Sequence, residues 1–240
     1  MLARKKNPAQ YWAAFFCLLL VFGSSGAVAQ VVGSVTKVQK QAQIGSTPAA
    51  NGTPVRLNDE IRTGPGARLQ ITFRDETSLT LGENASVVVD RYVYSPSTST
   101  GTLALNASQG ALRFATGKLG KMRNKDVTVT TPQAALAVRG TQFWAGFIPG
   151  DYQYGVLLIS ETGAVEVENS AGSVTLSQPG QGTDIPPPLK DDFGPVDPYI
   201  WDAAKVDRAL STTGFGLAFG PQNLLPAALI AIPLSRPASP

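Results

Sequence analysis

The chain has 240 residues with no histidine and one cysteine, and its 20 basic and 17 acidic residues give a formal charge of +3. Residues 1–29 hold three basic residues and no acid, so the rest of the chain is formally neutral and its charge gives no reason to expect nucleic acid as a ligand. The lack of histidine removes the usual zinc ligand and general base, so we expect no metal and no cofactor.

Residues 1–29 have the order of a secretory signal peptide. A basic start precedes the apolar run 11–23 (YWAAFFCLLLVFG), and 27–29 (AVA) provides the small residues that signal peptidase accepts. As a helix this run would be about 20 Å long, short of the roughly 30 Å hydrocarbon core. We therefore expect a periplasmic or secreted protein of a Gram-negative bacterium, without a transmembrane span after cleavage. The alternative is an uncleaved anchor. Cys17 lies in this run, so the exported part would have no disulfide.

Residues 31–176 have the pattern of short β-strands. Leu69, Ile71 and Phe73 alternate with polar residues, and similar runs follow with turn-forming residues about every ten positions. This pattern predicts an all-β domain over residues 30–182, either a jelly-roll-like β-sandwich or a short β-solenoid roll.

Residues 129–147 (VTTPQAALAVRGTQFWAGF) form the most distinctive stretch of this domain. Pro132 forces Thr131 into an extended or turn conformation. The small apolar residues 134–138 suit a strand covered on both faces, or a tight crossing where bulky side chains would not fit. Arg139 follows directly, and an isolated buried charge is costly. We therefore predict that its guanidinium clamps the turn by bonding several backbone oxygens. The alternative is a ligand-contacting arginine.

The aromatic residues near this stretch are candidate contacts for a ligand or a partner. They are Trp144, Tyr152 and Tyr154, although an aromatic residue near a strand end more often belongs to the core. Carboxylates occur at Asp75 and Glu76, where turns of any β-domain would also place them. No catalytic residue is therefore assigned.

The pattern changes after residue 182. A proline-rich linker starts at residue 183 and includes Pro186–Pro188, and Asp197-Pro198 is a typical helix start. We predict a short helix over about 198–211, followed by a flexible, poorly ordered tail to residue 240.

The stretch TTPQAALAVRGTQFWAGF resembles the signature of the FecR domain family. The matching structural residues are Thr131, Pro132, Val138, Arg139, Gly140, Thr141 and Phe143. The resemblance continues in order over roughly residues 40–182. Where the family has an Asp-Gly-Ser turn, this chain has Asp75-Glu76-Thr77.

The resemblance implies a periplasmic all-β domain of jelly-roll type. In the iron-citrate regulators that name the family, this domain receives a signal from an outer-membrane transporter and passes it to a sigma factor through a cytoplasmic N-terminal segment. Here about ten residues precede the apolar run, so we expect a stand-alone exported member without direct anti-sigma activity.

Three functions remain open at this point. The first is a non-enzymatic module that binds an envelope protein in sensing or assembly, through exposed sheet edges or the 198–211 helix. The second is a domain that binds carbohydrate or an envelope polymer through Trp144, Tyr152 or Tyr154. The third is a hydrolase based on carboxylates or serine, which would need a clustered pair in a deep cleft.

Overall fold

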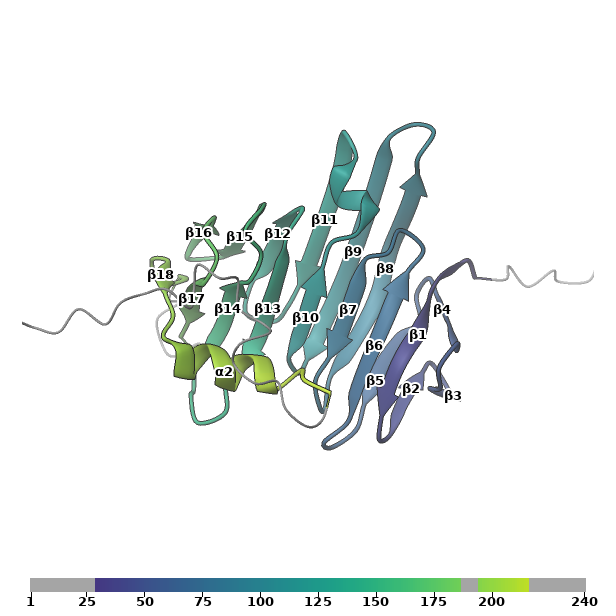
Figure 1. Ribbon diagram of the computed structural model, residues 1–240, viewed down its shortest axis with the longest axis horizontal. Helices are drawn as coiled ribbons and strands as arrows, with labels where there is room; N and C mark the ends of the chain where they lie inside the picture. Colours follow the sequence, from purple (N-terminus) through teal and green to yellow (C-terminus); the bar gives the residue numbers. More distant parts are fainter. Residues whose placement is uncertain (1–28, 187–193, 216–240) are drawn as a thin grey trace, which may run out of the picture.

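Two nine-stranded sheets lie face to face in the computed structural model, which describes residues 29–186 and 194–215 (Figure 1). Sheet A consists, in spatial order, of β18 (Tyr199–Ile200), β17 (Gln181–Ile185), β14 (Tyr154–Leu158), β13 (Gln142–Phe147), β10 (Leu112–Ala115), β7 (Ser78–Leu81), β6 (Arg68–Phe73), β1 (Val31–Gln39) and β4 (Pro54–Arg56). Sheet B consists of β16 (Gly172–Leu176), β15 (Ala164–Asn169), β12 (Ala135–Arg139), β11 (Asn124–Thr130), β9 (Thr100–Gln109), β8 (Ser86–Ser95), β5 (Glu60–Thr63), β2 (Ala42–Ile44) and β3 (Thr47–Pro48). A 3-10 turn, η1 (Lys118–Lys121), and a short helix, α2 (Ala203–Ser211), complete the described elements.

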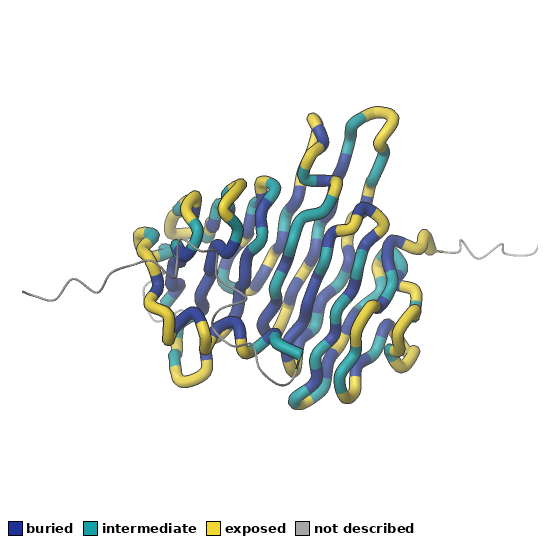
Figure 2. The backbone as a smooth tube through the Cα atoms, in the orientation of Figure 1, coloured by how far each residue is buried: buried dark blue, intermediate teal, exposed yellow. Residues whose placement is uncertain are grey.

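The alternating sequence pattern produces the core directly. In β6, Leu69, Ile71 and Phe73 point into the space between the sheets and are almost completely buried, while Gln70 and Thr72 point outward. The other long strands repeat this arrangement, so buried and exposed positions alternate along the backbone (Figure 2). The predicted all-β class, with a short C-terminal helix, is confirmed.

The chain builds the two sheets together. After β5 in sheet B it makes the pair β6–β7 in sheet A, then β8–β9 in sheet B, β10 in sheet A and β11–β12 in sheet B, and continues to alternate as far as β17–β18. All neighbouring strands are antiparallel except β9 and β11, which run parallel because β10 crosses to the other sheet between them. Of the two predicted architectures, two open sheets that face each other correspond to the β-sandwich.

The β6–β7 turn contains a buried carboxylate. Asp75 is fully buried, and its Oδ1 accepts a hydrogen bond from the Tyr92 hydroxyl at 3.0 Å, while its Oδ2 accepts from the Thr77 hydroxyl at 2.5 Å and from the Leu119 amide at 3.2 Å. Burial, followed by the nearby Asp75 charge, raises the pKa of Tyr92 well above its usual range. Glu76 has a φ of +69°, which favours glycine, and it lies where the FecR resemblance expects glycine. Asp75 is therefore a structural group that joins the turn to β8 and η1.

Residues 194–215, which we call the C-terminal extension, dock on the outer face of sheet A. Figure 1 shows α2 crossing the lower ends of β13 and β14. Trp201 is 1% exposed and lies directly on the backbone of Gly155 and Gly182, where an added Cβ would approach its indole ring to 2.6 and 2.2 Å. The Trp144 ring meets Trp201 edge to face at 6.2 Å, and its Nε1 donates to Thr212 Oγ1 at 2.9 Å. A second apolar core therefore lies outside the sandwich.

The C-terminal extension differs from the predicted helix. Helix α2 begins at Ala203, five residues later than predicted, because Tyr199–Ile200 pair with β17 as strand β18. The N-cap is Asp202, whose side chain accepts a hydrogen bond from Lys205 N at 2.8 Å, and Asp197 does not serve as the cap. Strand β17 also continues sheet A past the domain boundary predicted at residue 182.

Several predicted segments lie outside the described residues. They are the signal peptide up to residue 28, residues 187–193 of the proline-rich linker, and the tail from residue 216. Among the helices that the structure describes, none is long and apolar enough to span a membrane.

The contact between Trp201 and Gly182 gives a stability prediction. Gly182→Ala would place a methyl group inside the indole, so we expect a loss of about 1–3 kcal/mol of unfolding free energy, as overpacking typically costs. The matched control is Gly172→Ala in β16, because an added Cβ there meets no atom within 4 Å, and its effect should stay within about 0.5 kcal/mol. Urea unfolding followed by tryptophan fluorescence would compare the two. Equal stabilities would contradict the packing account.

Candidate functional site

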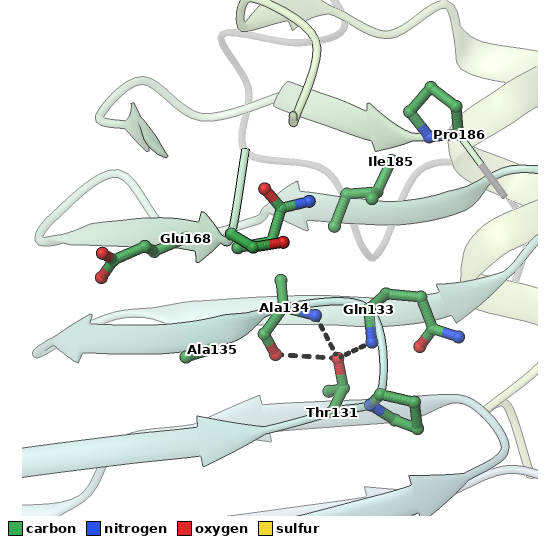
Figure 3. Close-up of a pocket in the computed structure, with 10 residues that line it drawn as sticks. Thr131, Gln133, Ala134, Ala135, Glu168, Ile185 and Pro186 are labelled. Atoms are coloured by element: carbon green, nitrogen blue, oxygen red, sulfur yellow. Dashed lines mark hydrogen bonds between the residues drawn. The ribbon is translucent and has the colours of Figure 1, made fainter. Parts of the chain in front are cut away.

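Three adjoining hollows lie along one rim of the sandwich, where strands of both sheets end. The first, of about 400 Å³, lies beside the Thr131–Ala134 turn (Figure 3). The second, of about 310 Å³, shares Pro132 and Gln133 with the first. The third, of about 460 Å³, shares Asn84, Ser108 and Gln109 with the second. Because neighbouring hollows share lining residues, we treat the three together and call them the rim groove.

The Thr-Pro pair of the sequence shapes the centre of the rim groove. Thr131 Oγ1 accepts hydrogen bonds from the Gln133 and Ala134 amides at 3.3 and 3.1 Å and donates to the Ala134 carbonyl at 2.9 Å (Figure 3). Thr131 N donates to the same carbonyl at 2.9 Å. Pro132 fixes its own φ and has no amide hydrogen to satisfy. The backbone groups of the turn thus form hydrogen bonds within the turn, and the Gln133 side chain lines the rim groove.

One exposed aromatic ring borders the rim groove. Phe147 is 49% exposed, and its ring meets Tyr154 edge to face at 5.3 Å. Burial raises the pKa of Tyr154 well above its usual range, so its hydroxyl stays protonated at neutral pH. With the amides and hydroxyls of the other lining residues, this wall suits non-covalent recognition of an extended ligand.

Arg139 does not form the predicted clamp. Its side chain is 69% exposed and pairs across β12 and β15 with Glu166, with Nη2 and Oε2 3.0 Å apart. The strand alternation explains the error, because Val138 points into the core and Arg139 must then point outward. The small residues are likewise not covered on both faces, since Ala135 is exposed. Exposed pairs of this kind contribute little stability.

The turn after Arg139 is built by its neighbours. Gly140 has a φ of +66°, and the Thr141 carbonyl accepts hydrogen bonds from Thr116 N and Oγ1 at 3.1 and 2.9 Å. Gly163 packs so closely on this turn that an added Cβ would lie 2.3 Å from the Arg139 carbonyl oxygen. Val138 and Phe143 point into the core. Gly140 and Thr141 therefore build the turn and Val138 and Phe143 the core, Thr131 and Pro132 shape the rim groove, and Arg139 lies outside on the surface.

The predicted aromatic contacts are only partly available. Trp144 is fully buried under the C-terminal extension, and Tyr154 is only 3% exposed, so neither offers an open ring to a ligand. Of the two alternatives for these rings, the core position holds for both, and the exposed contact does not. Tyr152 is 88% exposed in the β13–β14 loop, but it does not line the rim groove. Phe147 does line the rim groove, but it was not among the contacts predicted from the sequence.

The described residues offer no assembled metal site. Across 29–186 and 194–215, no three side chains of Asp, Glu, His or Cys lie close enough together to hold a metal ion. Glu60, which lines the third hollow, forms an ion pair with Arg62, whose Nη2 lies 2.7 Å from Glu60 Oε2.

Comparison with known proteins identifies the part of the chain that carries this geometry. The family model described as FecR protein matches residues 59–175, which include the Thr131–Ala134 turn and most of the rim groove. The chain contains a FecR domain. The FecR domain resemblance drawn from the signature stretch is thus confirmed.

Similar solved structures cover part of the chain. Two crystal structures of a candidate anti-sigma factor from Parabacteroides distasonis ATCC 8503, at 2.50 and 1.65 Å resolution, are each 22% identical, with TM-scores of 0.46 and 0.45. In both cases the similarity covers 62% of this chain and 62% of that chain, so less than two thirds of that protein is matched. No curated protein is significantly similar to the sequence.

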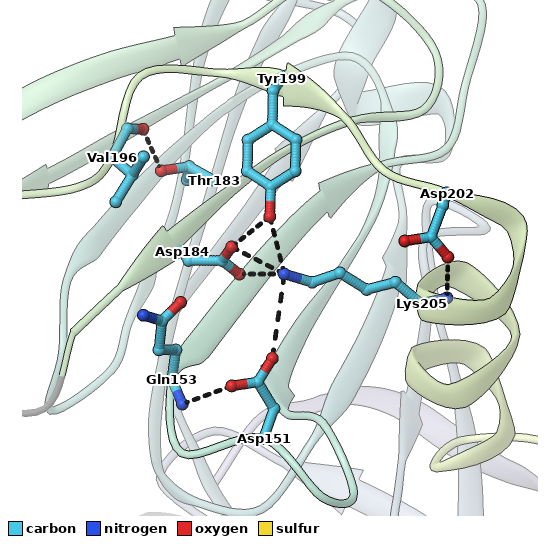
Figure 4. Close-up of polar contacts among 8 residues, drawn as sticks. All are labelled: Asp151, Gln153, Thr183, Asp184, Val196, Tyr199, Asp202 and Lys205. Atoms are coloured by element: carbon cyan, nitrogen blue, oxygen red, sulfur yellow. Dashed lines mark hydrogen bonds and ion pairs between the residues drawn. The ribbon is translucent and has the colours of Figure 1, made fainter.

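A buried polar cluster joins strand β17 to the C-terminal extension, and sequence reasoning missed it. Lys205 Nζ lies 2.8 and 2.7 Å from the two carboxylate oxygens of Asp184 and 2.8 Å from the Tyr199 hydroxyl (Figure 4). The side chains of Lys205 and Asp184 are only 10% and 6% exposed. Lys205 Nζ also lies 4.4 Å from the centre of the Trp201 ring, and Asp151 approaches it to 4.0 Å. Both Asp184 and Lys205 lie outside the matched residues 59–175.

Lys205 remains protonated at neutral pH. Burial alone would lower the pKa of Lys205, but its hydrogen bonds and charge interactions with Asp184 and Tyr199 outweigh that effect and raise it above 10.5. Burial and the hydrogen bond to Asp184 also raise the pKa of Tyr199. A raised lysine pKa stabilises the folded state below the ordinary lysine pKa, and this contribution is lost as the pH rises through the raised value.

The Lys205–Asp184 pair gives a second stability prediction. Lys205→Met would leave Asp184 buried without its cation, so we expect a loss of about 3–5 kcal/mol near neutral pH. The double variant Lys205→Met/Asp184→Leu removes both charges and should recover much of this loss. The defect of Lys205→Met should shrink as the pH rises above 10.5 through the raised pKa of Lys205. Urea unfolding across this range would measure it. A double variant no more stable than the single one would contradict the buried-pair account.

Arg139 gives the opposite prediction. Because its guanidinium is exposed and holds no turn carbonyl, Arg139→Lys should change the unfolding free energy by less than about 0.5 kcal/mol. A thermal melt of this variant beside wild type is sufficient. A drop of several degrees in melting temperature would restore the clamp interpretation.

Proposed function

We propose that this protein is a non-enzymatic FecR-type regulatory module, exported to the periplasm, which binds a protein partner in envelope sensing or assembly. The rim groove is the observation that carries the proposal, with the FecR match as support for a regulatory role. The signal-peptide pattern of residues 1–29 supports export.

The dimensions and lining of the rim groove favour an extended polypeptide. It crosses the ends of the sheet B strands from β5 to β15, which lie five strand spacings apart, or about 24 Å. An extended peptide of about seven residues has this length. Amide and hydroxyl side chains such as Gln109, Gln133 and Ser108 can pair with the N–H and C=O groups of such a backbone.

Binding of a carbohydrate or envelope polymer is the alternative, and one observation favours it. Phe147 offers an exposed ring at the groove wall, on which a sugar ring could stack. The predicted platform of Trp144 and Tyr154 is buried, however, so one ring remains where an aromatic surface was expected. We therefore prefer the protein partner.

Site-specific photo-crosslinking in the native bacterium tests this proposal. A photoreactive residue at Gln109 or at Gln133 should capture the same protein, because both positions line the rim groove. The matched control is Thr98, which is exposed in the β8–β9 loop and should not capture that protein.

The remaining outcomes decide between the two functions. Retention of the purified protein on peptidoglycan or polysaccharide, lost in Phe147→Ala, would favour the polymer alternative. Equal capture of the same protein from Thr98 and from the groove positions would count against the groove. Recovery of the protein from the cytoplasm with residues 1–29 intact would contradict export.

A further inference from the structure

The outer face of sheet A is divided into two halves. One half is apolar and rich in glycine, and the C-terminal extension covers it through Trp201 and α2. The other half, which we call the open half, is formed by the outward side chains of β1, β6, β7, β10 and the start of β13. Its central residues are Gln70, Ser78, Thr80, Arg113 and Gln142, which line a shallow hollow of about 200 Å³.

The open half has basic residues and no acidic ones. Strands β1, β6, β7, β10 and β13 contain Lys37, Arg68 and Arg113 but not one aspartate or glutamate. Sheet B differs, because its strands carry acidic residues among basic ones. These acids are Glu60, Asp90, Asp126, Glu166 and Glu168. The open half of sheet A therefore differs in charge from the outer face of sheet B.

Arg113 is the centre of the open half. It lies between Thr80 of β7 and Trp144 of β13 in the strand register. When the Gln142 amide is oriented with its oxygen toward Arg113, that oxygen accepts hydrogen bonds from Arg113 Nε at 3.0 Å and from Nη2 at 2.8 Å. A guanidinium has five N–H donors, so this one neutral partner leaves donors for a ligand. Burial lowers the pKa of Arg113, as expected for a desolvated cation.

The other two cations are engaged with the C-terminal extension. Arg68 Nη2 donates to the Ser211 carbonyl at the end of α2 at 3.4 Å, and Lys37 Nζ lies 5.9 Å from the centre of the Phe215 ring. Among the described residues of the open half, Arg113 is therefore the cation that a ligand could pair with most directly.

We propose that the open half binds an acidic peptide segment of a partner protein, with Arg113 forming a paired hydrogen bond to a carboxylate. Charge complementarity carries this assignment, because a planar guanidinium matches a carboxylate in geometry and charge. The five strands span four spacings, or about 19 Å, which an extended segment of about six residues would cross. Gln70 and Thr80 beside Arg113 supply partners for the peptide backbone.

Two other occupants fit this surface less well. An anionic polysaccharide would gain from aromatic stacking, but Trp144, the ring next to Arg113, is fully buried. The chain beyond the described residues supplies few acids, because residues 1–28 and 216–240 contain none and residues 187–193 contain Asp191 and Asp192. The open half shares no lining residue with the rim groove, so this inference does not depend on the proposed function.

Binding of fluorescently labelled hexaglutamate, followed by anisotropy with the full exported chain, tests the inference. Wild type should bind, more weakly at high ionic strength. Arg113→Gln should weaken binding at least about tenfold, because a charge-assisted paired hydrogen bond is lost. The matched control Arg91→Gln removes the same charge from an exposed position of sheet B and should stay within about twofold.

A second pair of variants protects the test against misfolding of Arg113→Gln. Ser78→Glu adds a negative charge to the open half while Arg113 itself is retained, and it should also abolish binding. Thr128→Glu adds the same charge to the outer face of sheet B and should not abolish binding. Thermal melts of all four variants would show which remain folded.

Several results would overturn the inference. They are no binding of hexaglutamate to wild type, equal binding to Arg113→Gln and Arg91→Gln when both are folded, and preference for polygalacturonate over hexaglutamate. Tighter binding by the double variant Asp191→Asn/Asp192→Asn would instead identify the chain's own segment as the occupant. If photo-crosslinking captured a partner at Gln109 and Gln133, the proposed function would stand whichever of these results was obtained.

Discussion

The contact of the Trp201 indole with the bare backbone of Gly155 and Gly182 determines how the outside of this molecule is organised. A side chain at either glycine would hold the indole away from the sheet, and β18 and α2 could not then reach their present positions. With the indole in place, Lys205 meets Asp184, and the two charges pair in a largely buried site. The same contact covers one half of sheet A and leaves the half around Arg113 uncovered.

The sequence could predict the parts of the fold that depend on local periodicity. Alternation along β6, as at Leu69 and Ile71, indicates an inward face whatever the strand later meets. Arg139 was misread because Ala135 and Ala137 look apolar, although their small side chains tolerate an outward position beside solvent. The strand period, applied consistently from Val138, would have placed Arg139 outside.

The parts that could not be predicted depend on pairing between distant segments. Lys205 and Asp184 are separated by 21 residues, and neither belongs to a motif that would link them. Trp144 points outward from sheet A, so its burial depends on the C-terminal extension, which reaches it only in the folded protein. The rim groove also escaped prediction, because Asn84, Gln109 and Gln133 lie at the ends of different strands and meet only when these strands end at the same rim.

The alternation of strand pairs between the two sheets affects how this protein can change in evolution. Each pair is hydrogen-bonded only to its immediate neighbours, and both sheets have open ends, at β4 and β3 on one side and at β18 and β16 on the other. A duplicated or deleted set of hairpins would therefore lengthen or shorten the body in whole steps while the remaining steps kept their contacts. Architectures of this kind can vary in size through repeat number, and their recognition surfaces grow in the same increments.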